Sequence, residues 1–543
     1  MSGAAELRLD YVSPLPPVRS GIADYSRDLV PALAEHCDLR IIAVPGQEIS
    51  EDIRGKYSPV GAHELGAGGR LPFYQMGNNP YHEEVQKLAL ASPGVVTLHD
   101  VVLHHLLIEA TLAKGDFEGY ARRLSEDHGW IGELVAKARY WGELSSAAMF
   151  GLPVHRTLVR CQRGILVHSQ WAAEQVLEEN PDLAVRVVPM GIPLPAPVDP
   201  EAARAFRSSR GLPPDCPLLG SFGFQTPIKR TVVVIQALAK PGLEDAHLLI
   251  AGEVSPQLEL AAEAIERGVS DRVHITGFLS YDEFEAAITA CDLCINLRYP
   301  TAGETSASLL RVLALGRPAV VSDYAQFREL PGEVALAVPL GESEAEELAR
   351  SAGEVLASPE ILERMGRAAR SFIARHHDPA VAAAAVIEAC LELRDLEPPR
   401  RAAEAVAPPT TLLWRDLPGE LEVSGADSPW SEGERRDVKV RLTNRGIARW
   451  LATKETPGGV QLTVEWRSEI GGEALEAEQN ELPRSLDTDQ AYEFRFALRR
   501  PLGSRYLVIE PHIDKLSGLS AFGGPSWVGD FTERMESASG LGS

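Results

Sequence analysis

The sequence predicts an α/β protein with two doubly wound domains, followed by an all-β sandwich domain. Short apolar segments alternate with segments of helical periodicity from residue 7 to residue 395, a pattern typical of parallel sheets covered by helices. A Pro-rich segment at 193–200 divides this half of the chain and indicates an interdomain hinge. Beyond Glu397 apolar and polar residues alternate, which indicates antiparallel strands with one buried face.

We therefore expect five segments along the chain. The first domain spans residues 1–195 and the second spans residues 196–396, with the option that the last helices of the second domain pack back on the first. A Pro- and Ala-rich linker, EPPRRAAEAVAPPTT, occupies residues 397–411. The sandwich is expected at 412–535, and a disordered tail at 536–543.

Composition narrows the classes of partner. The chain has 77 acidic and 53 basic residues and a formal net charge of −24, which disfavours broad electrostatic binding to nucleic acid or to anionic lipid. No run approaches the roughly 20 apolar residues of a membrane span. The first six residues lack the basic start and apolar core of a signal peptide. We expect a cytoplasmic protein without a nucleic-acid partner or transmembrane segment, compatible with peripheral contact at the inner face of a membrane.

The six cysteines are scattered and lie mostly in apolar segments. Cys291 and Cys294 have the CxxC spacing, but no second Cys/His pair lies nearby and the motif enters a predicted buried strand. Buried thiols in a reducing compartment explain this pattern better than a metal or redox site. We therefore expect no metal centre.

In the first domain, Gly21 lies in a Pro-rich loop at the mouth of the first helix, where a glycine lets a ligand approach the backbone closely. The alternative is a plain strand–helix turn. Segments 72–79 and 94–99 are predicted strands whose polar ends, with Asn78 and His99, face one crevice. For His99 the alternative is a satisfied, half-buried imidazole. The other strands of this domain are expected at 7–12, 39–44, 164–167 and 185–189, with helices at 22–34 and from residue 170.

The second domain is expected to repeat this alternation. Its strands are predicted at 216–222, 247–251, 273–278, near 293–297, at the end of the segment 293–322, and at 334–338. Its helices are predicted to begin near Thr231 and Tyr281, within 293–322, and at 343–358, 363–377 and 379–393.

A candidate diphosphate site follows the first of these strands. Gly223 frees the backbone, and Lys229 and Arg230 place two cations beside a helix start. Amide donors and positive charge together suit a pyrophosphate group. The alternative is a solvated basic turn.

A second candidate lies in the segment 293–322, which reads as strand, polar turn, helix, Gly-Pro break and strand. Gly303, Glu304, Thr305 and Ser306 stand at the expected helix N-terminus, outside the carboxyl end of a parallel strand. Free backbone amides at such a place suit a phosphate. The alternative is an ordinary strand–helix unit with a polar cap.

Beyond the linker, four alternating segments indicate a sandwich. They are predicted at 438–444, 460–466, 492–498 and 505–513. Trp450, Trp466 and Tyr506 are its expected core aromatics.

Taken in order, several stretches of the first 395 residues resemble the retaining family 4 glycosyltransferases. They are VSPLPPVRSGIADYS, TLHD, ILVHSQWAAEQV, VPMGIP, GSFGFQTPIKR, VHITGFLSYDEFEAAITACDLCINL and GETSASLLRVLALGRPAVVSD. The resemblance implies the glycosyltransferase B fold, in which two Rossmann-like domains face a cleft. It also implies transfer of a hexose from a UDP- or GDP-linked donor, a substrate rather than a cofactor, onto a glycan or lipid-linked acceptor, without a bound metal. The C-terminal region resembles immunoglobulin-like domains appended to bacterial polysaccharide-assembly proteins.

The resemblance also implies roles for individual residues. Gly21 would approach the donor phosphate and the acceptor, and His99 would contact the transferred sugar near the reacting centre. Lys229, six residues after Gly223, would bind the diphosphate. Glu304 would hydrogen-bond the sugar hydroxyls.

Further contacts are implied on both sides of the cleft. The amides of Thr305 and Ser306 would hold the phosphate, and Gly303 would lie beside them at the donor. Asn78 and Asp100 are expected on the acceptor side.

The sequence departs from the family pattern at two places. Phe224 stands where the family has an arginine after the glycine, and Arg230 is the expected substitute. Counted back from ALGRP, the two family glutamate positions hold Gly303 and Arg311, so Glu304 is one residue out of register and Arg311 replaces a contact to the donor.

The leading hypothesis is a retaining hexosyltransferase of bacterial polysaccharide biosynthesis. One alternative is another chemistry on this fold, such as nucleotide-sugar epimerisation. The other is a non-catalytic glycan-binding or scaffold protein whose donor site has decayed at Phe224 and Arg311.

Overall fold

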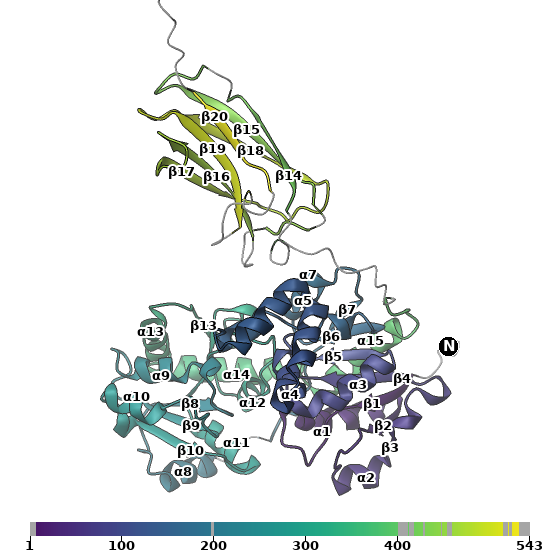
Figure 1. Cartoon of the computed structure of the whole chain (residues 1–543). Helices are drawn as coiled ribbons and strands as arrows, with labels where there is room; N and C mark the ends of the chain where they lie inside the picture. Colours follow the sequence, from purple (N-terminus) through teal and green to yellow (C-terminus); the bar gives the residue numbers. More distant parts are fainter. Residues whose placement is uncertain are drawn as a thin grey trace, which may run out of the picture. The chain divides into compact units, whose positions relative to one another are not determined.

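The computed structural model describes residues 7–196, 200–399, 411, 417–426, 429–446, 448–452, 459–513, 520 and 524–531. The chain divides into two units, Met1–Tyr120 with Leu144–Arg401, and Ala121–Glu143 with Ala402–Ser543. Figure 1 shows the elements of both units, which are described separately below. Of the predicted linker, only residues 397–399 and 411 are described. The predicted tail lies outside the described residues, as do residues 197–199 of the predicted hinge.

The first unit begins with a parallel sheet of order β3-β2-β1-β4-β5-β6-β7. The order reverses between β1 and β4, as in a doubly wound fold. Its strands are β1 (Arg8–Val12), β2 (Asp38–Ala43), β3 (Val60–Gly61), β4 (Leu71–Met76), β5 (Val95–Leu98), β6 (Gly164–Val167) and β7 (Val185–Val187).

Helices cover both faces of this sheet because their apolar stripes need a buried partner. The helices of this unit up to β7 are α1 (Gly21–Ala34), α2 (Glu51–Tyr57), α3 (Glu83–Ala91), α4 (His104–Ala110), α6 (Arg156–Val159) and α7 (Gln170–Glu179). The helix α5 (Phe117–Tyr140) begins in this unit, and its part from Ala121 onward belongs to the second unit. Short 3₁₀ turns lie at η1 (Ala62–Glu64), η2 (Ala67–Gly69), η3 (Pro80–His82), η4 (Leu112–Lys114) and η5 (Ser146–Phe150). Apolar side chains of α3, α4, α6 and α7 share one core with the sheet, and those of α1 pack in another.

A second parallel sheet has the order β10-β9-β8-β11-β12-β13, with its reversal between β8 and β11. Its strands are β8 (Leu218–Phe222), β9 (His247–Ala251), β10 (Val273–Gly277), β11 (Leu293–Asn296), β12 (Ala319–Ser322) and β13 (Ala335–Val338). Apart from β3, every strand of the two sheets was expected from the sequence, with boundaries that differ by at most three residues and agree at both ends for β6 and β9. The predicted α/β class with two doubly wound domains is confirmed.

The second sheet also has a helical layer on each face (Figure 1). One core holds α9 (Thr231–Leu238), α10 (Leu260–Glu266) and α13 (Glu344–Leu356). The other holds α8 (Pro200–Ser209), α11 (Tyr281–Ala290), α12 (Ala307–Ala314) and α14 (Pro359–His376). Three 3₁₀ turns complete the domain, η6 (Pro227–Lys229), η7 (Ser270–Arg272) and η8 (Ala325–Glu329).

The last helix, α15 (Pro379–Leu393), lies against α1 and β6 of the first domain. Arg163 donates to the carbonyl oxygens of Arg394 at 3.1 Å and Leu396 at 2.9 Å. A Cβ on Gly164 would come within 2.6 Å of the Leu393 side chain, so the glycine allows this close approach. The two parallel-sheet domains are therefore joined at both ends of the second domain.

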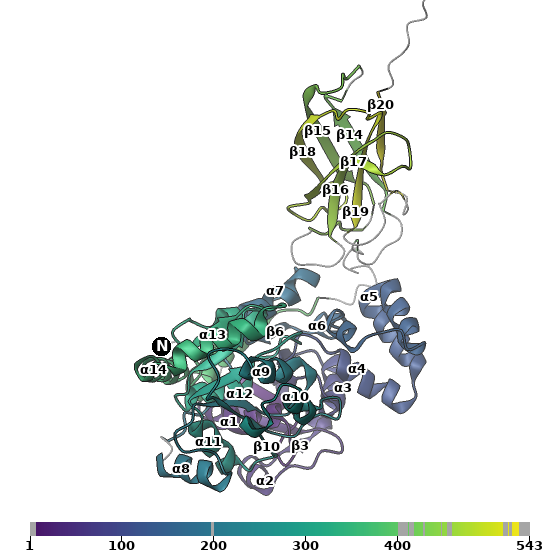
Figure 2. The same ribbon diagram turned by 90° about the vertical axis from the view of Figure 1, so that its left-hand side faces the viewer.

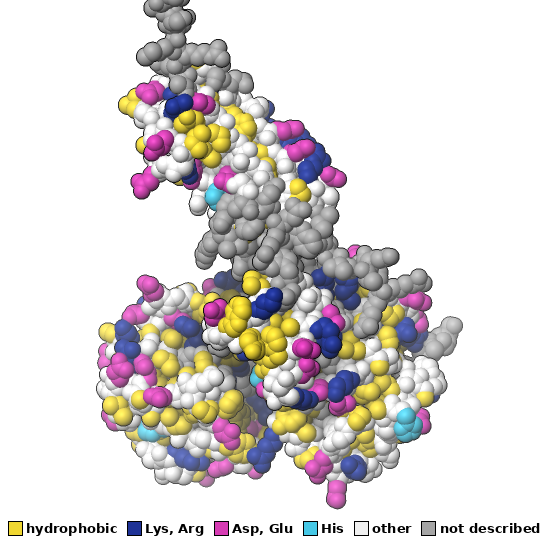
Figure 3. Space-filling view, in the orientation of Figure 1, with side chains coloured by type: hydrophobic (Ala, Val, Ile, Leu, Met, Phe, Trp, Pro, Cys, Tyr) yellow, Lys and Arg dark blue, Asp and Glu magenta, His cyan; other side chains and the backbone are white. Residues whose placement is uncertain are grey.

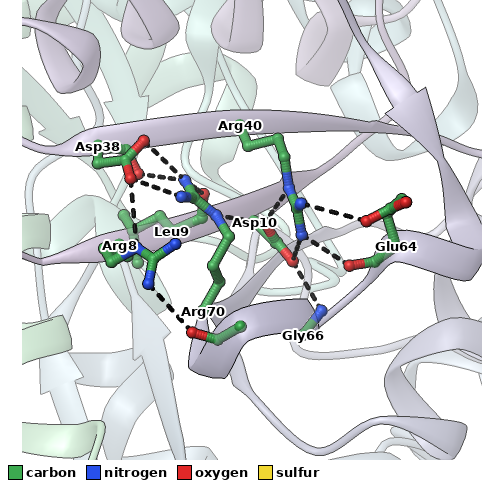
Figure 4. Close-up of polar contacts among 9 residues, drawn as sticks. Arg8, Leu9, Asp10, Asp38, Arg40, Glu64, Gly66 and Arg70 are labelled. Carbon is green, nitrogen blue, oxygen red and sulfur yellow. Dashed lines mark hydrogen bonds and ion pairs between the residues drawn. The ribbon is translucent and has the colours of Figure 1, made fainter.

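One buried charge cluster stabilises the first sheet (Figure 4). Asp10 of β1 is fully buried, and its Oδ1 accepts from Arg40 Nε and Arg70 Nε, both at 2.8 Å. Its Oδ2 accepts from the Gly66 amide at 2.7 Å. Arg70 also binds Asp38 at 2.6 Å. Each charge in this cluster thus has an opposite charge within hydrogen-bond distance.

The second unit contains two antiparallel sheets, β14-β15-β18 and β17-β16-β19-β20 (Figure 2). Their strands are β14 (Gly419–Ser424), β15 (Arg435–Asn444), β16 (Val460–Arg467), β17 (Ala474–Glu481), β18 (Ala491–Arg499), β19 (Tyr506–Ile513) and β20 (Trp527–Asp530). The four predicted strands are present, and Trp450, Trp466 and Tyr506 are buried as expected. The sequence prediction missed β14, β17 and β20, and a buried Trp430. The immunoglobulin-like character of this region stays a prediction.

No helix in the described part of the chain is both long enough and apolar enough to cross a membrane.

Candidate functional site

The carboxyl ends of strands from both parallel sheets meet across a groove, where α/β proteins bind ligands (Figure 3). The loop after β5 contacts the loop after β11 directly, because the Val102 amide donates to the Ala302 carbonyl oxygen at 2.9 Å. Gly303 has a φ of +84°, and a Cβ there would come within 2.8 Å of the Val101 side chain. A larger residue would therefore push the two loops apart.

A second contact between these domains involves the start of α7. The Glu329 carboxylate of η8 accepts from the Gln170 amide at 3.0 Å and from the Trp171 amide at 2.7 Å. The first amides of a helix are unpaired within the helix and carry a partial positive charge, so a carboxylate is a favourable partner.

On the first-domain side, His99 lies in a buried chain of hydrogen bonds. His168 Nδ1 donates to the Val188 carbonyl oxygen at 3.0 Å, and His168 Nε2 lies 3.2 Å from His99 Nδ1. On the other side of the ring, His99 Nε2 donates to Gln75 Oε1 at 2.9 Å, because an amide oxygen can only accept. Burial lowers the pKa of His99 well below the usual value and that of His168 to about 4. His99 is thus neutral, and both of its ring nitrogens are occupied.

The residue after His99 reaches the groove. Asp100 Oδ2 accepts from the Asn78 amide at 2.7 Å, and Asn78 Oδ1 in turn accepts from the Leu106 amide at 2.9 Å. Burial, and secondarily the charge of Glu304, raise the pKa of Asp100 to about 7. Since Glu304 belongs to the second domain, Asp100 and Glu304 face each other across the groove.

Gly21 begins α1 at the edge of this region. It is exposed, and a Cβ there would meet no other atom within 4 Å. The next residue, Ile22, packs over Gly77, and a Cβ on Gly77 would come within 3.3 Å of Asp100 Oδ2. The start of α1 therefore borders the Asp100 side of the groove, and the role of Gly21 in ligand binding stays a prediction.

On the second-domain side, the loop after β8 wraps around Lys229. Gly223 has a φ of +85°, and a Cβ on it would lie 2.8 Å from Lys229 Nζ. The ammonium group donates to the Phe222 carbonyl oxygen. Burial, and next the nearby Arg298, lower the pKa of Lys229 well below its usual value. Among the described residues, the Lys229 ammonium therefore has a single hydrogen-bond acceptor, the Phe222 carbonyl oxygen.

Arg298 is a residue that the sequence prediction missed. It follows β11 directly, and its NH1 forms an ion pair with Glu304 Oε1 at 3.0 Å. Its side chain is 12% exposed. A cation immediately after a buried strand at the reversal of a parallel sheet was the available signal, because that is where such sheets bind ligands.

Glu304 is held at the start of α12 by its own loop. Its Oε2 accepts from Thr301 Oγ1 at 2.9 Å and from the Ala302 amide at 3.0 Å. Ser306 caps α12 by accepting from the Leu309 amide, and it donates to Asn296 Oδ1 at 3.1 Å. Thr305 lies between them, partly buried. The predicted helix start with Glu304 at its mouth is therefore present.

Two of the expected donor-binding cations have partners elsewhere. Arg230 is paired with the carboxylate of Glu344, which is 1% exposed. Arg311 extends toward α1, where it lies 4.0 Å from Asp24 and 5.2 Å from the centre of the Tyr281 ring. The structure thus brings Lys229, Glu304 and Asp100 together, but it directs Arg230 and Arg311 to other carboxylates.

The second domain is similar to a known protein family. Residues 216–358 match the family model described as Glycosyl transferases group 1. The matched segment contains Gly223, Lys229, Arg298 and Glu304, and so covers the second-domain side of the groove.

A curated relative is similar over part of the chain. The 2-deoxystreptamine glucosyltransferase of Streptomyces kanamyceticus is 27% identical over 233 residues, which are 41% of this chain and 58% of the relative. The similarity thus spans less than two thirds of that protein.

Two solved structures are similar to this chain over 70% or more of its length. A glycosyltransferase from Rickettsia africae superposes with a TM-score of 0.50 at 12% identity, over 72% of this chain and 99% of that one. Anabaena HepE in complex with UDP gives a TM-score of 0.47 at 14% identity, over 70% of this chain and 99% of that one. The first of these likenesses shows the fold that the sequence predicted for the two parallel-sheet domains.

The described residues contain no group of three or more His, Cys, Asp or Glu side chains placed to hold a metal ion.

Proposed function

We propose that this chain is a glycosyltransferase that moves a hexose from a UDP- or GDP-linked donor onto a glycan or lipid-linked acceptor in bacterial polysaccharide biosynthesis. The observation that supports it best is the placement of Lys229 over Gly223, next to Glu304 and across the groove from Asp100. The match of residues 216–358 and the similarity to a glucosyltransferase agree with it.

In this proposal the second domain binds the donor. The Lys229 ammonium stabilises the negative charge that develops on the leaving diphosphate, as positive groups do in a preorganised site. Glu304 accepts hydrogen bonds from sugar hydroxyls with the carboxylate edge that now faces Arg298. The amides of Thr305 and Ser306 at the start of α12 bind the phosphate nearer the sugar.

The first domain presents the acceptor. The acceptor oxygen attacks the anomeric carbon as the bond to the diphosphate oxygen breaks, and the hydroxyl proton passes to the leaving phosphate. Attack from the face of the leaving group retains the anomeric configuration. His99 fixes the end of β5, which carries Asp100 as the next residue, rather than moving a proton itself, because both of its ring nitrogens face protein groups.

The proposal is tested by thermal shift of the full chain against UDP, GDP and their sugar conjugates. A ligand that binds the folded state raises the melting temperature by mass action. We expect a shift with one nucleotide, its loss in Lys229→Ala, and its retention in Lys240→Ala, whose side chain is exposed and paired with Glu346. Absence of any shift in the wild-type chain contradicts the proposal.

A non-catalytic glycan-binding role is the second candidate. It is favoured by Phe224, which is 54% exposed at the position where the resemblance requires a cation. Glycan binding without any nucleotide binding would support this second role. Transfer of radiolabelled hexose to any acceptor, abolished in Glu304→Gln, would exclude it.

A further inference from the structure

We propose that Arg298 is the second cation of the diphosphate site and takes the place of the arginine that Phe224 replaces. The inference rests on the proposed function and names a residue for the same site. Arg298 follows β11 in the chain. Its backbone amide donates to Ser322 Oγ at 2.9 Å, which fixes it between the ends of β11 and β12.

Arg298 lies beside the Lys229 loop. The Tyr299 amide donates to the Ile228 carbonyl oxygen at 2.9 Å, so the residues after Arg298 and before Lys229 are hydrogen-bonded neighbours. The two cations consequently meet at one place in the groove. Their mutual repulsion contributes to the lowered pKa of Lys229. An anion placed between them removes this repulsion, and a diphosphate has enough oxygens to accept from both.

The guanidinium group of Arg298 has a hydrogen-bond donor without an acceptor among the described residues. One edge meets Glu304 through NH1 at 3.0 Å. Its Nε is buried and has no hydrogen-bond partner among the described residues. A buried N–H without an acceptor is unfavourable, and the planar fork of arginine suits two phosphate oxygens at once. Arg298 can therefore keep Glu304 on one edge and bind a phosphate with the other.

The other two cations expected at the donor site, Arg230 and Arg311, are already paired with carboxylates. Arg230 is held by Glu344, and releasing it would leave a nearly fully buried carboxylate unpaired. Arg311 is turned toward Asp24 and the Tyr281 ring. Phe224 is apolar and exposed. Arg298 is the cation that both faces Lys229 and has a donor without a partner in the described part of the chain.

The test measures binding of inorganic pyrophosphate, UDP and GDP by calorimetry to the wild-type chain and to Arg298→Gln, Arg298→Lys and Arg230→Gln. Pyrophosphate isolates the diphosphate contact because it carries no base or sugar. We expect Arg298→Gln to weaken binding by about 10- to 100-fold, the usual worth of a hydrogen bond to a charged group. Arg298→Lys should recover part of the loss, since it restores the charge but not the fork.

Arg267→Gln is the matched control, because it removes an exposed arginine with its own carboxylate partner, Glu263, at 2.8 Å. It should bind pyrophosphate as the wild type does. If Arg298→Gln misfolds, the double variant Arg298→Gln, Glu304→Gln removes both members of the ion pair together. Pyrophosphate binding then still reports on Arg298, because Glu304 faces the sugar.

The outcomes separate this inference from the proposed function. Unchanged binding in Arg298→Gln, or a loss confined to Arg230→Gln, overturns the assignment of Arg298. If Lys229→Ala, measured beside these variants, abolishes pyrophosphate binding while Arg298→Gln does not, the proposed function survives that result. If the wild-type chain binds none of the three probes, both proposals fail together.

Discussion

The Asp10 cluster and the Lys229 cluster both bury charge beside a parallel sheet, but the charges find different partners. Asp10 receives two arginines and an amide, and Arg70 has a second carboxylate. Lys229 donates to one carbonyl oxygen and lies next to another cation, Arg298. The first cluster is complete within the protein. In the proposed function the second is completed by an anion from outside, and this would distinguish a structural charge cluster from a binding site.

Removal of Asp10 tests whether its cluster is structural, and it should cause the largest loss in the free energy of unfolding. Asp10→Ala leaves Arg70, whose side chain is 5% exposed, without its central partner. Breaking a buried ion pair from one side costs about 3 to 5 kcal/mol in the free energy of unfolding, which urea titration measures. Asp38→Asn is the control, because Asp38 is half exposed and its loss should cost about 1 kcal/mol or less. Equal costs for the two variants would show that burial of Asp10 is unimportant.

Lys229→Met should weaken ligand binding without lowering the stability of the fold, the opposite of the effect expected for Asp10→Ala. We expect nucleoside diphosphate affinity to fall by about 10- to 100-fold, because a hydrogen bond to a charged group is lost. The free energy of unfolding should stay constant or rise, since a partly buried cation is replaced by an apolar side chain of similar length. Calorimetry and urea titration of the same sample measure both. A loss of stability comparable to that of Asp10→Ala would place Lys229 among the structural charges.

The pH dependence of stability sharpens the comparison at Asp100. Its pKa rises from 3.8 in the unfolded chain to about 7 in the folded chain, so the folded state binds the extra proton between these values. Stability contributed by Asp100 is therefore present below pH 3.8 and is lost as pH rises to about 7.

Asp100→Asn should remove this loss. We expect the wild-type free energy of unfolding to fall relative to that of Asp100→Asn by about 4 kcal/mol across the window, because each pKa unit corresponds to about 1.4 kcal/mol. The difference between the two proteins is needed because His82 and His168, with pKa values lowered to about 4 by burial, contribute in the opposite direction. A pH-independent difference would contradict the raised pKa.

The smallest expected effect is at Glu329. Glu329→Gln keeps one acceptor oxygen but removes the charge at the start of α7, which costs about 0.3 to 1 kcal/mol. Since this contact joins the two domains, the domains should open more often, and hydrogen exchange at the Gln170 and Trp171 amides should accelerate. Gln257→Ala, on an exposed loop of the second domain, should leave this exchange unchanged. Exchange that is equally slow in Glu329→Gln would rule out the carboxylate as a closing contact.

The sequence was most informative where structure is local. Apolar runs bounded by turn residues predicted every strand of both parallel sheets except β3, and the Gly303 to Ser306 turn before an apolar stripe predicted the start of α12. In the second unit β17 was missed because its residues are almost all exposed, so it has no alternation to detect.

Long-range pairing escaped the sequence prediction. Arg230 was expected to bind phosphate, but its partner Glu344 is 114 residues away in the chain and nothing near Arg230 indicates it. Arg311 meets Asp24 from a different domain for the same reason. Arg298 was overlooked because a single arginine after a strand resembles a solvated side chain until the neighbouring Lys229 loop is in place.

The two sides of the contact between Glu329 and α7 differ in how easily a mutation can remove them. One half is a carboxylate that a single base change can remove, and the other half is main chain. Gln170 and Trp171 can each be replaced by most residues without losing the amides that Glu329 binds. Most substitutions at Gln170 and Trp171 in the first domain therefore leave this contact intact, whereas a substitution that removes the carboxylate of Glu329 abolishes it. The contact between the two domains is thus far more sensitive to mutation in the second domain than in the first.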